Sequence, residues 1–160
     1  MTSPMSLPAW LYTDPRFFET EREKVFRPAW HIMGHINDAR RAGDYLTLDI
    51  LGERIVTLRG EDGALRSFHN VCRHRAGKLA PEARGSCGHR LVCPYHAWSY
   101  KLDGSFAGAP KWQGFDDLDA NALGLKPVDQ EIAFGFIFVR LESGLPSVAD
   151  MMAPYADELA

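Results

Sequence analysis

The chain has 160 residues, of which 46% are apolar and 24% are charged, proportions that are ordinary for a globular domain with one core. Its formal net charge of −3 gives no electrostatic reason to expect binding to nucleic acid or to a membrane surface. No apolar run approaches the roughly 18 residues of a membrane span, and the start lacks the features of a signal peptide, so we expect a cytoplasmic protein.

A helix is predicted near the start of the chain, over residues 14–27. Asp14 is suited to cap this helix, and Pro15 is suited to its first position. Pro28 should end it, because a residue that precedes proline disfavours the helical conformation. We therefore assign residues 1–40 to an N-terminal helical arm.

From residue 43 onward, short segments of alternating apolar and polar residues predict β-strands. Turn sequences separate them, including Glu61-Asp62-Gly63 and Asp103-Gly104. Strands are predicted over residues 44–51, 53–59, 64–70, 90–93, 97–102 and 134–141. This spacing is typical of a mostly-β domain, and we expect a small antiparallel β-sandwich or barrel over residues 41–142.

Residues 143–160 predict a further helical segment. Ser147 is suited to cap it, with Asp150 three residues later, and apolar residues then follow at helical spacing, although Pro154 interrupts them. An apolar helical face without a C-cap has two interpretations. It is either a terminal helix that docks on the same domain or the start of a linker to a second domain, and we favour the linker.

Two cysteine–histidine pairs form the strongest chemical pattern. Cys72 and His74 lie in "CRHR", and after eighteen intervening residues Cys93 and His96 follow in "CPYHAW". Zinc sites usually place two cysteines on one turn and two histidines on another element, whereas here each segment offers one of each. The pattern suits a [2Fe–2S] cluster in which both thiolates bind one iron and both imidazoles bind the other. A structural zinc site through the same residues is the alternative.

Other cysteine and histidine residues are weaker candidates. Cys87 lies between the two pairs in a polar segment, and we expect a free thiol there, with Cys87 and His89 as substitute ligands the alternative. His31 and His35 have the spacing of one helical turn, but the glycine between them and the strand pattern that follows argue against a helix. We expect these two histidines and His69 to be structural.

The segment "CRHR", followed by "CPYHAWSY" and "LDGSFAGAP", resembles the α subunits of Rieske non-haem iron oxygenases. These include the aromatic-ring-hydroxylating dioxygenases and relatives that act on quaternary amines. The segments "FRPAWHIMGH" and "GFIFVRLE" extend the resemblance over most of the chain. It implies a Rieske [2Fe–2S] domain that passes electrons from a reductase or ferredoxin to a mononuclear iron, which hydroxylates an aromatic or quaternary-amine substrate. It also implies trimers in which each cluster serves the iron of a neighbouring α subunit.

The resemblance further implies roles for single residues. Cys72 and Cys93 would bind the buried iron, and His74 and His96 the outer iron. Three aromatic residues would pack over the cluster and limit its contact with water, namely Tyr95, Trp98 and Tyr100. Trp98 stands where high-potential Rieske proteins carry a serine that hydrogen-bonds a cluster sulfur. This difference predicts a potential in the lower part of the family's window of roughly −150 to +300 mV.

Two arginines flank the first histidine of the pattern. Arg73 and Arg75 would either pin the loop to backbone carbonyls or reach the carboxylates of a partner, with solvated charge as the plain alternative. The oxygen chemistry of the family needs an iron held by two histidines and a carboxylate, and no histidine follows His96. We therefore expect no catalytic residue in this chain, and a mononuclear Fe(II) only in an absent catalytic domain. A stand-alone Rieske ferredoxin is the alternative among redox proteins.

Overall fold

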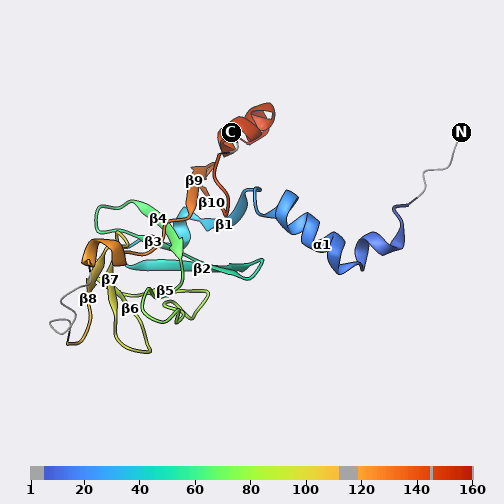
Figure 1. Ribbon diagram of the computed structural model, residues 1–160. Coiled ribbons are helices and arrows are strands. Elements are labelled where there is room, and N and C mark those ends of the chain that lie inside the picture. Colours follow the sequence, from blue (N-terminus) through green and yellow to red (C-terminus); the bar gives the residue numbers. More distant parts are fainter. Residues whose placement is uncertain (1–5, 112–118, 145, 160) are drawn as a thin grey trace, which may run out of the picture.

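The computed structural model describes residues 6–111, 119–144 and 146–159. Within these ranges the strands form three antiparallel sheets, which confirms the mostly-β prediction (Figure 1). The first sheet has the order β1 (His31–His35), β10 (Phe136–Arg140) and β9 (Asp129–Ala133). The second has the order β4 (Leu65–His69), β3 (Glu53–Arg59), β2 (Asp44–Ile50) and β5 (Arg84–Ser86). The third has the order β6 (Arg90–Val92), β7 (Ser99–Lys101) and β8 (Phe106–Gly108).

The central hairpin follows the prediction closely. β2 and β3 pair from Tyr45 opposite Leu58 to Ile50 opposite Glu53, and β3 has the bounds predicted for the strand at 53–59. Leu51 and Gly52 form the connecting turn with φ angles of 53° and 83°, as a two-residue hairpin turn with matched twist requires. The strands could be predicted because apolar and β-branched residues run between turn sequences, although β3 is buried on both faces from Ile55 to Leu58.

Other strands differ from the prediction. Four were not predicted, and each of these lies at the edge of its sheet, where a pairing partner rather than a sequence pattern stabilises it; the four are β1, β5, β8 and β9. The strand predicted over 134–141 begins only at Phe136, so its bounds were wrong. Phe134 and Gly135 have φ angles of 51° and 78° and form the turn between β9 and β10. The turn was not predicted because its residues continue the apolar sequence of the strand.

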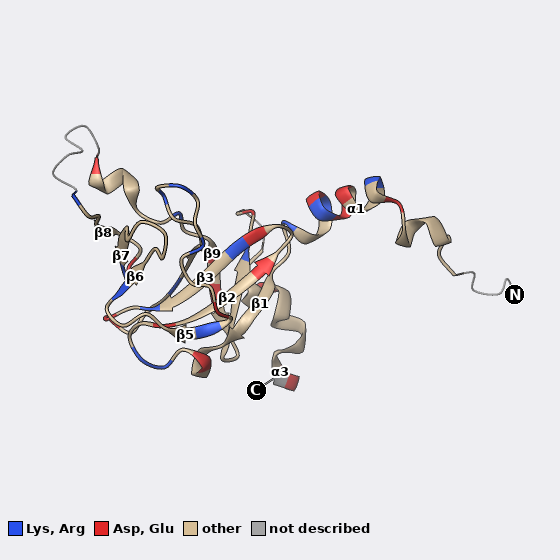
Figure 2. Ribbon diagram, turned by 90° about the horizontal axis from the view of Figure 1, so that it is seen from below, with Lys and Arg blue, Asp and Glu red and all other residues tan. Residues whose placement is uncertain are grey.

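The N-terminal arm begins as predicted. α1 (Pro15–Glu21) is capped by Asp14, whose carboxylate accepts a hydrogen bond of 2.8 Å from the backbone amide of Arg16. The second half of the predicted helix is instead a π-helical turn, Arg22–Phe26, and a 3₁₀ turn, Ala9–Tyr12, precedes the helix. The arm extends away from the sheets, and its charged residues gather on α1 and the following turn (Figure 2).

The C-terminal segment also begins as predicted. The hydroxyl of Ser147 accepts a hydrogen bond of 3.0 Å from the amide of Asp150 and caps α2 (Val148–Met152). A 3₁₀ turn, Ala153–Tyr155, contains the predicted interrupting proline, and α3 (Ala156–Leu159) follows. Val148 is buried and Met152 is half-buried, whereas Met151 and Tyr155 are exposed, so α2 docks on the domain through part of one face. Its role as a linker stays a prediction. No helix in the described ranges is long and apolar enough to cross a membrane.

The buried side chains form two clusters, one on each face of the four-stranded sheet. One cluster joins this sheet to the sheet of β1, β9 and β10 and includes Leu46, Ile55 and Ile137. The other joins it to the sheet of β6–β8 and includes Val56, Leu58, Phe68, Leu91, Tyr100, Cys72 and Cys93. Two of the predicted metal ligands, Cys72 and Cys93, therefore belong to the core shared with the sheet of β6–β8.

Two 3₁₀ turns complete the described elements. Ile36–Asp38 follows β1, and the side chain of His35 caps it by accepting a hydrogen bond of 3.1 Å from the amide of Asn37. Ala120–Leu123 precedes the segment that leads to β9, and Asp119 caps it. Both caps satisfy backbone donors that the short turns leave free.

Candidate metal centre

The first predicted ligand pair lies on a tight loop between β4 and the segment that leads to β5. The amide of Cys72 donates to the carbonyl of Gly77 at 2.8 Å, and the amide of Ala76 donates back to the carbonyl of Cys72 at 3.0 Å. Ala76 adopts a φ of 55°, a conformation that costs a residue with a Cβ roughly 1–2 kcal/mol. The loop is therefore closed by two hydrogen bonds around its cysteine.

The second pair lies on a loop of the same design between β6 and β7. The amide of Cys93 donates to the carbonyl of Trp98 at 2.8 Å, and the amide of Ala97 donates to the carbonyl of Cys93 at 3.0 Å. Ala97 has a φ of 54°, matching the alanine at the same place in the first loop. The two loops thus repeat one backbone motif, with a cysteine at the root and a histidine near the tip.

The loops bring all four predicted residues together. The ring centroids of His74 and His96 are 4.8 Å apart, with the planes at 73°. At the roots, a Cβ added to Gly77 would lie 3.4 Å from the sulfur of Cys93, so the loops meet there as well. Cys72 and Cys93 are 2% and 3% exposed, whereas His74 is exposed and His96 is half-buried. The thiols face the core and the imidazoles face the surface.

One atom of the site indicates a missing partner. The Nδ1 atom of His96 is buried and has no hydrogen-bond partner among the described residues. A buried polar atom left in this state is costly, and nearly all such atoms in folded proteins are satisfied. An imidazole nitrogen is a common ligand for iron and zinc. The chemistry of the four side chains and this orphaned nitrogen therefore fit a metal group between the loop tips.

The arrangement is not that of a site for one ion. In the described part of the chain, no three or more His, Cys, Asp or Glu side chains are grouped to hold a single metal ion. A Rieske cluster does not require such a group, because each of its two irons takes only two protein ligands.

Tyr100 contributes a hydrogen bond that sequence analysis missed. Its side chain is fully buried, and its hydroxyl oxygen accepts a bond of 2.9 Å from the amide of Arg73. The hydroxyl also lies 3.3 Å from the sulfur of Cys72. Burial, together with the contact to Cys72, raises the pKa of Tyr100, so the hydroxyl keeps its proton and can donate it to the sulfur. The sequence signal was a tyrosine in a predicted strand, because a tyrosine hydroxyl that becomes buried usually finds a hydrogen-bond partner.

The other two predicted aromatic neighbours behave differently from each other. Trp98 is buried and stacks on the ring of His74, with centroids 4.7 Å apart and planes at 6°. Tyr95 is 63% exposed, and its ring lies 3.9 Å from that of His96. The three rings thus lie around the proposed ligands, Trp98 and Tyr100 on the buried side and Tyr95 on the exposed side of His96, and their shielding of a cluster from water stays a prediction.

Asn70 is a second residue that sequence analysis missed. It is fully buried at the end of β4, two residues before Cys72. Its side-chain oxygen accepts hydrogen bonds from the amides of Leu79 and Ala80, and its side-chain nitrogen donates to the carbonyl of Ala80. These three bonds tie the chain before the first loop to the chain after it. Asparagine at the end of a strand was the only sequence signal.

The weaker candidates lie in other surroundings. Cys87 is half-buried, its thiol lies 3.3 Å from the carbonyl of Gly43, and burial raises its pKa, all consistent with a protonated free thiol. His31 and His35 lie on β1, not on a helix, and both make hydrogen bonds to nearby backbone. The ring of His69 lies 3.6 Å from the carboxylate of Glu53.

Comparisons with known proteins identify the class. Residues 29–121 match the family described as the Rieske [2Fe-2S] domain, and the chain belongs to this family. Its cofactor is accordingly a [2Fe–2S] cluster of the Rieske type, as the sequence predicted.

Its relatives define the group more narrowly. The chain is 42% identical over 155 residues to the glycine betaine monooxygenase oxygenase subunit of Chromohalobacter salexigens, covering 97% of the chain and 34% of that protein. It is 40% identical over 147 residues to the carnitine monooxygenase oxygenase subunit of Escherichia coli, covering 92% of the chain and 39% of that protein. The predicted resemblance to oxygenase subunits is confirmed.

Solved structures agree in fold. A quaternary ammonium Rieske monooxygenase in complex with L-carnitine superposes with a TM-score of 0.88 at 34% identity, covering 96% of this chain and 44% of that one. Naphthalene 1,2-dioxygenase from Rhodococcus sp., bound to indole, gives a TM-score of 0.84 at 30% identity, covering 94% and 36%. The chain therefore spans well under half the length of the proteins that it matches.

Proposed function

We propose that this chain is the electron-transfer domain of a Rieske oxygenase subunit. Cys72 and Cys93 would hold one iron of the cluster, and His74 and His96 the other. The observation that carries this assignment is the pair of matching loops, which buries both thiols and presents both imidazoles near the surface. The orphaned Nδ1 of His96 is the supporting detail.

When bound, the cluster supplies one-electron oxidation and reduction. The protein contributes a dry pocket around the thiolates, because the core that surrounds both cysteines excludes water. Tyr100 donates a hydrogen bond toward the sulfur of Cys72 and is held in place by the amide of Arg73. Trp98 fixes the ring of His74 by stacking on it. The ring edges of the two histidines are the part of the site that a partner protein can reach.

We propose that the intact protein hydroxylates a quaternary amine. Support comes from the relatives, which include glycine betaine and carnitine monooxygenase subunits at 34–42% identity, whereas the naphthalene dioxygenases are 29–30% identical. Electrons would come from a reductase or ferredoxin in the cytoplasm. They would pass to a mononuclear iron of a neighbouring α subunit in a trimer. A solved quaternary ammonium Rieske monooxygenase that this chain matches has given insights into inter-subunit electron transfer in that protein, which supports this route.

The test is electron paramagnetic resonance of the purified chain with metal analysis beside it. About two irons per chain, no signal when oxidised, and a rhombic signal after reduction with dithionite are expected. A colourless chain with one zinc and no signal would refute the electron-transfer assignment and establish the zinc alternative.

Matched variants test the four ligands. Cys72→Ser and His96→Ala should abolish the reduced signal, because each removes a ligand of one iron. Cys87→Ser and His89→Ala change the same residue types outside the loops and should keep it. Retention of an unchanged signal in Cys72→Ser or His96→Ala would contradict the assignment of that residue.

A further inference from the structure

A groove of about 500 Å³ lies beside the exposed face of the first loop, next to His74. Among the described residues, its lining includes the cationic side chains of Arg73, Arg75 and Lys126 and no carboxylate. We call these three residues the cationic collar. They share this groove with His74, which is the most exposed of the four proposed ligands.

The collar has no ion-pair partner in the part of the chain that the structure describes. Among the described residues, no carboxylate lies within 4 Å of any of its three cationic groups, although the chain as a whole carries a net charge of −3. The guanidinium of Arg75 lies 5.9 Å from the centre of the exposed Tyr95 ring. Three like charges that share one groove repel one another, and water screens this repulsion only in part.

The backbone beneath the collar is fixed while its side chains face water. The amide of Arg73 donates to Tyr100, and the carbonyl of Lys126 accepts a hydrogen bond of 2.9 Å from the amide of His69. All three collar residues are exposed. The charges are therefore displayed from a rigid base, which lowers the cost of ordering them against a partner.

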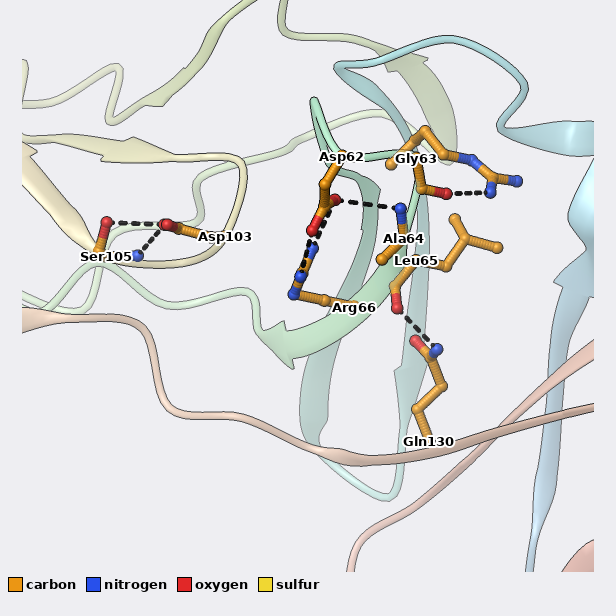
Figure 3. Close-up of polar contacts among 9 residues, drawn as sticks. Asp62, Gly63, Ala64, Leu65, Arg66, Asp103, Ser105 and Gln130 are labelled. Atoms are coloured by element: carbon orange, nitrogen blue, oxygen red, sulfur yellow. Dashed lines mark hydrogen bonds and ion pairs between the residues drawn. The ribbon is translucent and has the colours of Figure 1, made fainter.

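A second groove of the same domain shows the contrast. It measures about 360 Å³ and also carries three cationic residues, but Glu61, Asp62 and Asp103 line it as well. There Asp62 pairs with Arg66 through both carboxylate oxygens (Figure 3). Lys101 lies in this groove, at the end of the β6–β7 hairpin away from the ligand loop. Of these two grooves, the one beside His74 is therefore the one whose cationic side chains share the lining with no carboxylate among the described residues.

We infer that the cationic collar is the docking surface for an acidic electron-donor protein. The inference rests on the proposed function and names the chemistry of its partner. Carboxylates of the donor would neutralise the collar, and its redox group would approach the exposed edge of His74. Charge complementarity of this kind mainly accelerates association and fixes orientation, and salt weakens it.

The test compares Lys126→Glu with Lys101→Glu. Both substitutions change the net charge by the same amount, and both lie outside the ligand loops. The probe is a strongly acidic plant-type ferredoxin, photoreduced and mixed with the oxidised chain in a stopped-flow instrument. At about 20 mM ionic strength, Lys126→Glu should slow the second-order reduction roughly tenfold, and the rates should converge above about 0.5 M. Lys101→Glu should stay within about twofold of the wild type.

Two further measurements separate this inference from the proposed function. Binding of the oxidised ferredoxin to each immobilised chain, followed by interferometry, reports docking whether or not the chain carries its cluster. The paramagnetic signal of each dithionite-reduced variant reports the cluster itself. If Lys126→Glu loses the salt-sensitive binding and Lys101→Glu keeps it, the result supports the collar as the docking surface. Equal binding and equal rates in the two variants, or no binding by the wild type, would overturn it even if the cluster is present.

Arg73→Glu provides a second variant in the lining of the same groove. It should slow reduction by a similar factor, and with Lys126→Glu the two effects should add on a logarithmic scale, because both charges act on one partner. A double variant no slower than either single variant would contradict a shared docking surface.

Discussion

Replacing Tyr100 by phenylalanine removes one hydroxyl from the buried side of the metal centre and leaves the aromatic ring in place. In the wild type the hydroxyl oxygen accepts from the amide of Arg73 at 2.9 Å, so its own proton is free to point toward the sulfur of Cys72 at 3.3 Å. A hydrogen bond to a cluster sulfur stabilises the reduced, more negative state more than the oxidised state. Tyr100→Phe should therefore lower the reduction potential.

The magnitude follows from one hydrogen bond. An ordinary hydrogen bond contributes roughly 0.5–1.5 kcal/mol, and about 1.4 kcal/mol corresponds to 59 mV for a one-electron couple, so the potential should fall by about 20–60 mV. The substitution also leaves the amide of Arg73 without its partner. An unsatisfied buried donor costs roughly 1–3 kcal/mol, so the free energy of unfolding should fall as well.

The assay is a redox titration followed by the paramagnetic signal of the reduced chain, with urea denaturation for stability. Tyr45→Phe is the matched control, because Tyr45 is also a buried tyrosine but packs beside Gly85 of β5 and not against a ligand cysteine. The control should shift the potential by less than about 10 mV, since no hydrogen bond to a sulfur changes. An equal shift in the two variants would refute the role given to the Tyr100 hydroxyl.

Three further predictions concern stability, each measured by urea denaturation. Ser67 donates a hydrogen bond to Gln130 and accepts one from Thr57, both at 2.6 Å. Ser67→Ala removes both bonds and should cost about 2–3 kcal/mol, whereas Thr57→Val removes one and should cost about 0.5–1.5 kcal/mol. Equal costs would contradict this order of donors. A hydrogen bond from the backbone amide of His35, aided by Arg84, lowers the pKa of Asp38. The wild type should therefore be more stable than Asp38→Asn at pH 7 and should lose this advantage as the pH falls through the lowered pKa. A stability difference that does not change with pH would refute this role of Asp38. Gly104→Ala should cost roughly 2–4 kcal/mol, because the turn has a φ of 86° and the new Cβ would clash with the ring of Phe68 on β4, and a neutral effect would contradict that geometry.

The parts of the fold that sequence predicts are those in which a local pattern and the final environment agree. β3 has its predicted bounds because a run of apolar and β-branched residues, buried on both faces of the sheet from Ile55 to Leu58, lies between two turns. The caps Asp14 and Ser147 are where they were expected, because capping depends only on neighbouring residues. By contrast, the three residues of β5 are all exposed, and only pairing with β2 makes them a strand. No local signal encodes such a partner.

The same distinction applies to the metal centre. Its four candidate ligands could be predicted because cysteine and histidine carry their chemistry in the residue type. The supporting residues could not, because tyrosine and asparagine have many ordinary roles. Tyr100 lies on β7 and Asn70 at the end of β4, and each becomes informative only when the fold places it against the first loop.

The difference in burial between cysteines and histidines follows from the loop motif itself. In both loops the cysteine is the residue whose amide and carbonyl are used to close the loop, so its side chain stays with the strand that feeds the core. The histidine comes two residues later in the first loop and three later in the second. At this point the chain has turned toward the surface, and the following alanine with positive φ turns it back toward the core. One short motif, used twice, thus gives thiols a dry environment and imidazoles an exposed one. Under the proposed ligand assignment, this polarity places the histidine-bound iron on the side where the cationic collar can hold a partner.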